Sequence, residues 1–162
     1  MRIRHLLALS LVSLLAACGF HLRGAYALPF ATLHIGLPEA AEIRSMIRRT
    51  VESSSPARVV SDAKAADASL QVLGDVPQKI AIALNSSGQA LEYQLVRTFS
   101  FRLVDKSGNE LIAPSRIVIH RDMTFTDAGV LAKESEEALL WRDIQNDLVQ
   151  QLMRRLAAAK AK

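Results

Sequence analysis

Cysteine and histidine, which are common in metal sites and in nucleophilic catalysis, are few among the 162 residues. The chain has one cysteine, Cys18, and four histidines, His5, His21, His34 and His120. No two histidines have the spacing of a zinc motif such as HExxH, and one cysteine cannot complete a cysteine-based zinc site. No GxSxG motif is present, and the seven glycines are not gathered in a phosphate-binding loop. The sequence therefore predicts no resident metal or cofactor and no enzymatic activity.

A cluster of acidic residues, Glu134, Glu136 and Glu137, suggests acid–base catalysis at first sight. Such catalysis needs a second group positioned beside the acid, and no partner stands out in the sequence. The cluster lies where a long helical pattern begins, and the helix macrodipole favours negative charge there. We interpret these glutamates as charges in the first turns of a helix.

Cys18 follows a segment that is typical of export. Two arginines come first, residues 6–15 are almost wholly apolar, and two alanines precede the cysteine. This is the order of a secretory signal, and an apolar run of about ten residues is too short to cross a bilayer as a helix. Leu15-Ala16-Ala17-Cys18 resembles the lipobox of bacterial lipoproteins. We therefore predict a signal peptide over residues 1–17, with an S-diacylglycerol and an N-acyl group on Cys18.

Lipidation gives a lone cysteine in an exported chain a role. Each buried CH₂ of an acyl chain contributes about 0.8 kcal/mol, and two chains suffice for stable anchoring, so we expect attachment to a membrane through the lipid. The predicted signal contains two of the 20 Lys and Arg residues and none of the 16 acidic ones, so its removal lowers the formal charge from +4 to +2. So small a charge argues against nucleic acid as a partner.

The rest of the chain predicts one α+β domain over residues 30–158, after a tether at 18–29 and before a frayed tail at 159–162. Alternation of apolar and polar residues indicates strands, and apolar residues at intervals of three and four indicate helices. Arg58–Val60 could add a short edge strand. The expected strands are 31–36, 70–84, 91–104 and 112–125, and the expected helices are 39–52 and about 128–160.

The three long strands are separated by turn signals and each has one apolar face, which predicts an antiparallel meander covered on one side. Pro77 interrupts the first of them and favours an edge position or a bulge there. The expected fold is a two-layer sandwich, with two helices on one face of a roughly four-stranded mixed or antiparallel sheet in the order β-α-β-β-β-α. In the first long strand we expect one apolar face on even positions, formed by Leu70, Val72, Val76, Ile80, Ile82 and Leu84.

Two arginines lie among apolar residues of these strands. Arg97 falls between Leu95 and Phe99, and Arg121 falls on the corresponding face of the last strand. A buried charge is costly unless it is paired. Either both side chains lie near the sheet margin and extend into solvent, or they form a site for an anion or a partner.

Four segments, taken in order, carry a family resemblance. The segments are Cys18-Gly19-Phe20-His21-Leu22-Arg23-Gly24, Gly88-Gln89-Ala90-Leu91-Glu92-Tyr93-Gln94-Leu95, Ile119-His120-Arg121-Asp122-Met123-Thr124-Phe125 and Val130-Leu131-Ala132-Lys133-Glu134-Ser135-Glu136-Glu137. Their order and spacing, with the lipobox before them, resemble the LptE (RlpB) family of lipopolysaccharide-assembly lipoproteins over nearly the whole mature chain.

The resemblance implies a lipoprotein of the outer membrane, anchored on its periplasmic side. Members of the family plug the LptD β-barrel one to one, assist its assembly, bind lipopolysaccharide and help deliver it to the outer leaflet, without covalent chemistry. The family's basic lipopolysaccharide-binding positions correspond to Ser86, which is not basic, and to Lys133. Lys133, Arg121 and Arg97 are therefore the candidates for binding lipopolysaccharide, and Lys133 could equally be an ordinary exposed lysine near a helix start.

Two other hypotheses remain open. The first is a freestanding outer-membrane lipoprotein that binds an envelope lipid or polymer, which copurification with a barrel protein distinguishes from a plug. The second is a lipid-anchored hydrolase, which the sequence disfavours because it offers no credible pair of nucleophile and base. Sorting to the outer membrane is favoured by Gly19, because an aspartate after the cysteine is the inner-membrane retention signal in enteric bacteria.

Overall fold

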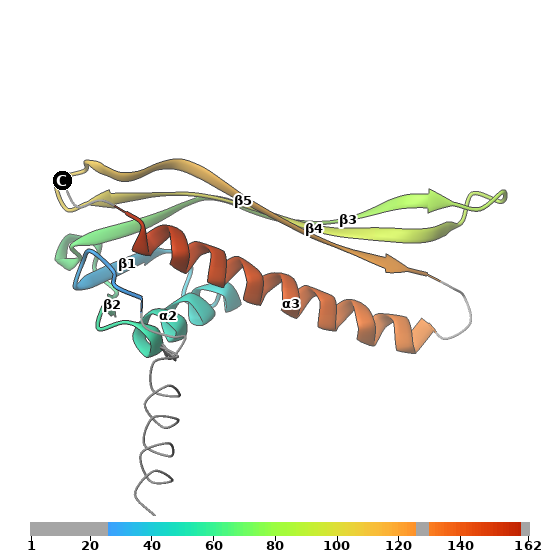
Figure 1. The fold of residues 1–162 in the computed structure, drawn as a ribbon, viewed down its shortest axis with the longest axis horizontal. Helices are drawn as coiled ribbons and strands as arrows, with labels where there is room; N and C mark the ends of the chain where they lie inside the picture. The colour runs from blue at the N-terminus through green and yellow to red at the C-terminus, as the bar shows by residue number, and fades with distance from the viewer. Residues whose placement is uncertain (1–25, 126–129, 160–162) are drawn as a thin grey trace, which may run out of the picture.

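The computed structural model describes residues 26–125 and 130–159. The predicted signal peptide (1–17) and the predicted lipidation site, Cys18, lie outside these ranges. A long sheet forms one layer and two helices form the other (Figure 1). The elements are β1 (Thr32–Gly36), α2 (Glu42–Ser54), β2 (Arg58–Val60), a 3₁₀ turn (Ala63–Ala65), β3 (Ala68–Leu84), β4 (Ala90–Asp105), β5 (Glu110–Thr124) and α3 (Val130–Ala157).

The strand order is β2-β1-β3-β4-β5. β1 runs parallel to both of its neighbours, whereas β3, β4 and β5 form an antiparallel meander. The sequence-based α+β sandwich with two helices is thus confirmed. The sheet has five strands because Arg58–Val60, which the sequence left open, pairs with Thr32–His34 as a short edge strand.

The core lies between the sheet and both helices. Fully buried side chains come from β1, from the faces of β4 and β5 that point toward the helices, and from one stripe of each helix. In α3 this stripe repeats every four residues, as its sequence predicts. Burying each of its large apolar side chains contributes about 1.5–3 kcal/mol. The stripe consists of Ile144, Leu148, Leu152 and Leu156.

β3 does not keep one apolar face, contrary to the sequence-based expectation. Its register against β4 shifts between Val72 and Gly74, and this bulge turns the following residues over. Val76 and Ile80 then lie on the outer face of the sheet, roughly half exposed, and Lys79 lies on the helix face. The expectation is wrong beyond Val72, because one extra residue in a strand exchanges its two faces.

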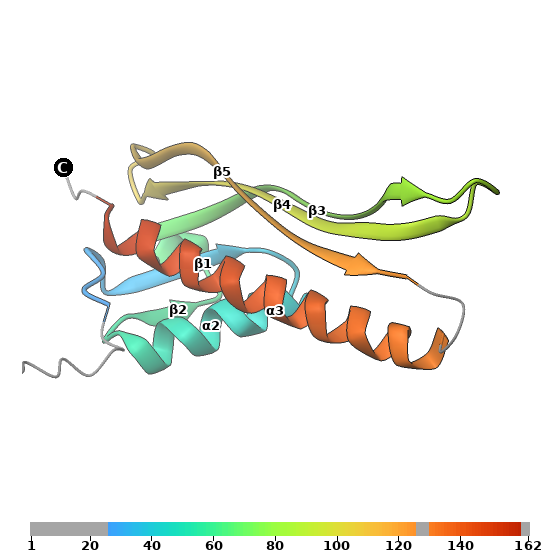
Figure 2. The same ribbon diagram turned by 45° about the vertical axis from the view of Figure 1, so that its right-hand side comes forward.

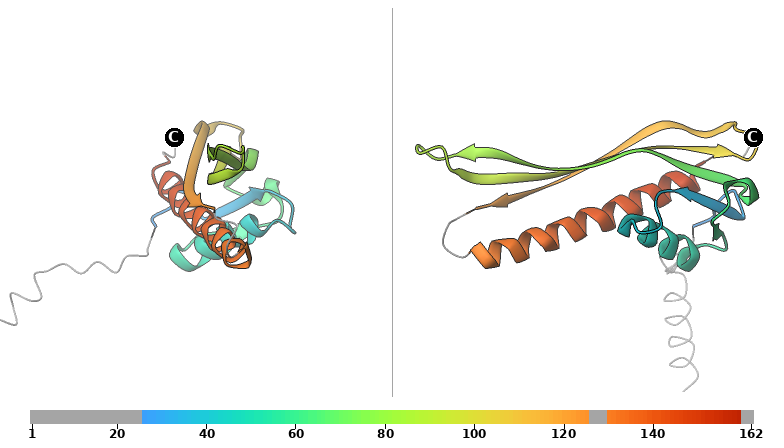
Figure 3. Two further views of the ribbon diagram at one scale, coloured as in Figure 1. Left: turned by 90° about the vertical axis from the view of Figure 1, so that its right-hand side faces the viewer. Right: turned by 180° about the vertical axis from the view of Figure 1, so that it is seen from behind.

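β3 is also much longer than the strand beside it. β1 pairs with β3 only from Ala68 to Gln71, so from Val72 onward β3 borders β4 alone. β1, β2 and α2 occupy one half of the molecule, while the hairpin of β3 and β4 continues beyond them (Figures 2 and 3). The edge position that Pro77 favours is confirmed.

The ends of the domain also pack against it. Tyr26, in the predicted tether, donates its N–H to Ser54 O at 2.7 Å and its hydroxyl to Gln150 Oε1 at 3.0 Å. α2 begins at Glu42, three residues later than expected, and it buries Arg44 together with Ile43, Ile47 and Val51. Within the described ranges, neither helix has both the length and the apolar character needed to cross a bilayer.

Candidate functional site

Four cations lie along the contact between the helix face of the sheet and α3, three of them near the fully buried Leu95 of β4. The strand registers place Lys79 of β3 and Arg121 of β5 on either side of Leu95, and Arg97 two residues further along β4. Lys133 extends from the first turns of α3. We call Lys79, Arg97, Arg121 and Lys133 the cationic cluster. It contains all three of the sequence-predicted lipopolysaccharide-binding candidates.

Arg97 is the most buried member of the cluster. Its Nε and one terminal nitrogen donate to the two carboxylate oxygens of Asp75, at 2.8 and 2.7 Å. Only 10% of the Arg97 side chain and 19% of the Asp75 side chain are exposed. Arg97 therefore does not extend into solvent, and its charge is neutralised by a two-point ion pair from the neighbouring strand.

Arg121 joins β5 to α3. Its guanidinium donates to Asp143 Oδ2 at 2.7 Å, to Asp147 Oδ2 at 3.4 Å and to the His120 carbonyl at 2.9 Å. The hydrogen bond to Asp143 is the main cause that raises the pKa of Arg121, with Asp147 adding to it. About a third of the side chain is exposed, so this charge reaches solvent while it holds the helix against the sheet.

Lys133 lies at the start of α3, facing the end of β5. Its Nζ contacts Glu136 Oε2 at 2.8 Å and Thr124 Oγ1 at 3.4 Å. The side chain is 19% exposed, so it is not the fully exposed lysine of the alternative interpretation. Glu136, which the sequence placed in the first turns of a helix, is found there and pairs with this lysine.

Lys79 is the member that the sequence analysis missed. Its Nζ lies 2.7 Å from Glu137 Oε2 and 4.4 Å from the centre of the Tyr93 ring, and Trp141 Nε1 donates to the other oxygen of Glu137 at 3.3 Å. Lys79 reaches the helix face only because of the bulge between Val72 and Gly74. A bulge depends on how two strands pair, so alternation in one strand did not indicate it.

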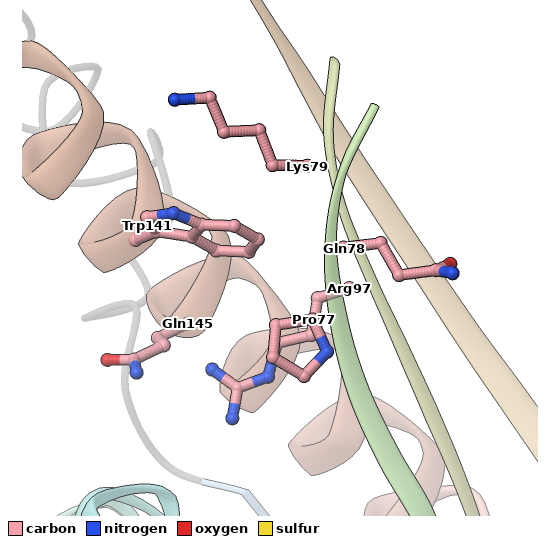
Figure 4. Close-up of a pocket in the computed structure, with 6 residues that line it drawn as sticks. All are labelled: Pro77, Gln78, Lys79, Arg97, Trp141 and Gln145. Atoms are coloured by element: carbon pink, nitrogen blue, oxygen red, sulfur yellow. The ribbon is translucent and has the colours of Figure 1, made fainter. Parts of the chain in front are cut away.

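A cleft of about 520 Å³ opens beside the cluster, between β3 and α3 (Figure 4). Its walls are mostly apolar, and the charges at its margin are those of the two neutralised pairs, Arg97–Asp75 and Lys79–Glu137. Within residues 26–125 and 130–159, no three metal-binding side chains come together. The cleft is lined by Pro77, Gln78, Lys79, Arg97, Trp141 and Gln145.

Carboxylates within the fold satisfy the whole cationic cluster. Asp75 engages Arg97, and acidic residues of α3 engage the other three. The pairs of Lys79 with Glu137 and of Arg121 with Asp143 and Asp147 hold α3 on the sheet. The Arg97–Asp75 pair joins two strands, and the Lys133–Glu136 pair lies within α3. These side chains can bind an anion and can hold the helix on the sheet.

A comparison with protein families decides the relationship of this chain to known proteins. The model described as LptE, Lipopolysaccharide-assembly, matches residues 30–156. The chain belongs to the LptE family. The match extends from two residues before β1 to the last turn of α3 and so includes the whole cationic cluster. The family that the sequence motifs indicated is confirmed.

Curated relatives agree with this assignment. The LPS-assembly lipoprotein LptE of Pectobacterium atrosepticum is 29% identical over 149 residues, which is 90% of this chain and 79% of that protein. The protein of the same name from Yersinia enterocolitica is 28% identical over 150 residues, covering 90% of this chain and 71% of that one. These matches span the described domain of this LptE-family chain.

Solved structures agree on the fold. Uncharacterized lipoprotein B from Nitrosomonas europaea, solved by NMR in solution, is 35% identical, covers 86% of this chain and 91% of its own, and superposes with a TM-score of 0.75. The crystal structure of rare lipoprotein B from Shewanella oneidensis has a TM-score of 0.66 at 22% identity, covering 78% and 94%, and supports the fold alone. The two-layer architecture is therefore shared with lipoproteins of other bacteria.

Proposed function

We propose that this protein is an outer-membrane lipoprotein that takes part in lipopolysaccharide assembly as the plug of an LptD-type β-barrel, in a one-to-one complex. The observation that carries the proposal is the match to the LptE family over residues 30–156, preceded by an export signal and a lipobox. Acyl groups on Cys18 would hold the domain at the periplasmic face of the membrane. This role requires binding and positioning and no covalent catalysis.

The surface of the domain suits a polar barrel lumen. The outer face of the sheet carries polar residues such as Gln94, whose amide donates to Asp122 Oδ1 at 2.9 Å, and His120 is exposed beside them. Val76 and Val118 add apolar area to the same face. A mixed polar and apolar surface of this kind is typical of the interface of a protein that also has to remain soluble while unassembled.

Lipopolysaccharide carries phosphate groups, which lysine and arginine bind well. Within the cationic cluster, we propose Lys133 as the first contact, because one ion pair and one long hydrogen bond leave its ammonium group a third N–H to donate to another partner. The guanidinium groups of Arg121 and Arg97 are already engaged by aspartates on several nitrogens. They are secondary candidates, which would contribute only if a phosphate displaced a carboxylate.

Copurification tests the proposed complex. The lipidated protein, isolated through an affinity tag in mild detergent, is expected to bring with it one LptD-type barrel per copy. Isolation without a barrel would contradict the plug role and favour the freestanding lipoprotein that binds an envelope lipid or polymer. Turnover of ester or glycoside substrates by the pure protein would instead support a hydrolase.

Binding of purified lipopolysaccharide tests Lys133. We expect Lys133→Glu to weaken binding about tenfold, since one charge-assisted contact is lost and a repulsion is added. The matched control is Glu136→Gln, which breaks the same 2.8 Å pair but keeps the lysine, and it should bind at least as well as the original protein. Equal loss in both variants would show that the pair matters only for structure.

A further inference from the structure

The part of β3 that extends beyond β1, from Val72 to Leu84, leaves one edge of the sheet open. From Val72 to Leu84 no other strand of the described chain lies on the side of β3 away from β4. In the other half of the molecule, the same side of β3 is filled by β1 (Figures 1 and 2). A further strand in line with β1 could therefore pair with this part of β3, and no described strand of the chain does so.

Pro77 reveals which backbone groups face this open edge. Proline has no N–H, so in a strand it occupies a position whose nitrogen points away from the ladder. The register with β4 is continuous from Gly74 to Ala81, so Asp75, Lys79 and Ala81 have the same orientation as Pro77. Their N–H and C=O groups point to the open edge, while those of the residues between them face β4.

The charged side chains of this stretch of β3 are paired inside the fold. Asp75 pairs with Arg97 and Lys79 pairs with Glu137, each at 2.7 Å. The residues that follow, Ile80 to Leu84, are uncharged and include two isoleucines, a type enriched in strands. Because its two charges are neutralised within the fold, this edge fits a neutral polypeptide backbone rather than a phosphate-rich ligand.

The cleft completes the place for a strand. Pro77 and Lys79 line one wall from the helix face of β3, and Trp141 and Gln145 line the other from α3 (Figure 4). Side chains of a strand alternate between faces, so every second residue of a strand added beside β3 would point toward this space. The cleft is therefore suited to apolar side chains of a strand whose backbone is bonded to the edge.

We propose that the edge of β3 from Asp75 to Ala81 is a strand-addition site, on which an extended segment of the barrel partner continues the sheet. Main-chain hydrogen bonds would supply the attachment, and the cleft would accept alternate side chains. This inference rests on the proposed function, because it assigns a surface to the same partner. In this site the backbone N–H and C=O groups of Asp75, Lys79 and Ala81 would form hydrogen bonds to the partner, which a general contact between plug and barrel does not require.

Hydrogen–deuterium exchange tests the site at single-residue resolution, in the lipidated protein alone and in its purified complex with the barrel. The amides of Asp75, Lys79 and Ala81 should exchange at least about tenfold more slowly in the complex. Val76 and Ile80 provide the internal control, since their amides face β4 in both samples. If the complex forms and the three amides exchange as in the free protein, the site is refuted although the proposed function stands.

A pair of variants gives an independent measurement. Ala81→Pro removes an edge N–H in the way Pro77 already does, and Ala81→Ser keeps it. We expect the proline variant to bind the barrel about tenfold more weakly than the serine variant, the effect of one partner carbonyl left unbonded. Equal affinities of the two variants for the barrel would overturn the proposal. It would also be overturned if the edge amides became protected from exchange in the protein alone as its concentration rises, which would indicate a second copy, or if pure lipopolysaccharide protected them. Should the proline variant not fold, the exchange experiment decides alone.

Discussion

Replacing Arg97 by methionine separates its structural role from a role in binding. The substitution keeps most of the side-chain volume but leaves the Asp75 carboxylate without its two donors, at 2.8 and 2.7 Å. Breaking a buried ion pair by removing one partner costs about 3–5 kcal/mol. Because 19% of the Asp75 side chain remains exposed, solvent can partly rehydrate it, and we expect the lower end, about 3 kcal/mol.

The double variant Arg97→Met with Asp75→Leu provides the control. It removes both charges together, and replacing a buried pair by apolar residues of similar volume is often neutral. We therefore expect the double variant to lie within about 1 kcal/mol of the original protein, and so to be more stable than the single one.

Chemical denaturation of the protein in detergent, followed by circular dichroism, measures these differences. A loss of about 3 kcal/mol corresponds to a fall in Tm of roughly 10 °C for a domain of this size. The reasoning is refuted if Arg97→Met costs less than about 1 kcal/mol, or if adding Asp75→Leu deepens the loss. A stable single variant that has lost lipopolysaccharide binding would instead assign Arg97 to the ligand.

Three further changes test other parts of the structure. Arg121→Met should lower stability by about 1 kcal/mol at low salt, because its two ion pairs to α3 are half exposed, and the effect should shrink in 1 M salt; an effect independent of salt would point to packing. Hydrogen bonds from the Thr32 hydroxyl and N–H lower the pKa of Asp67 below its ordinary value of 3.8. The original protein should therefore have a higher free energy of unfolding than Asp67→Asn above pH 3.8, and this difference should disappear as the pH falls through the lowered pKa. An equal difference at pH 7 and pH 3 would contradict this reasoning. Gly88→Ala should cost about 1 kcal/mol, since Gly88 has a φ of 79°, whereas Ser87→Ala beside it should be nearly neutral in the same unfolding assay.

The sequence was sufficient for those features that depend on local repetition. The four-residue interval from Ile144 to Leu156 predicted α3, and the two turns between alternating segments predicted the meander. The predicted ends of the helices were less accurate than the helices themselves. After Pro38 the chain first makes a turn, closed by the hydrogen bond from the Ala41 N–H to Pro38 O, and α2 begins only at Glu42. No side-chain hydrogen bond caps its first turn, so no capping residue marked the start.

Features that depend on pairing between distant segments could not be read from the sequence. Asp75 and Arg97 are 22 residues apart, and only the register of β3 against β4 brings them together. The bulge after Val72 belongs to the same class, and it decides that Lys79 faces α3. The apolar surroundings of Arg97 and Arg121 indicated two unusual charges but could not identify the carboxylates that bind them.

Those carboxylates change how the cationic cluster must work if it binds a ligand. A phosphate that approaches Lys133 meets Glu136, 2.8 Å from the ammonium, and one that approaches Arg121 meets two aspartates of α3. Binding therefore has to exchange an internal ion pair for an external one, which limits the net gain. At Arg121 the same exchange weakens the attachment of α3 to the sheet, because the cation belongs to β5 and both aspartates belong to the helix, whereas Lys133 and Glu136 both lie on α3. Ligand binding at Arg121 and the docking of α3 are thus linked through shared charges, and a variant that strengthens one should weaken the other.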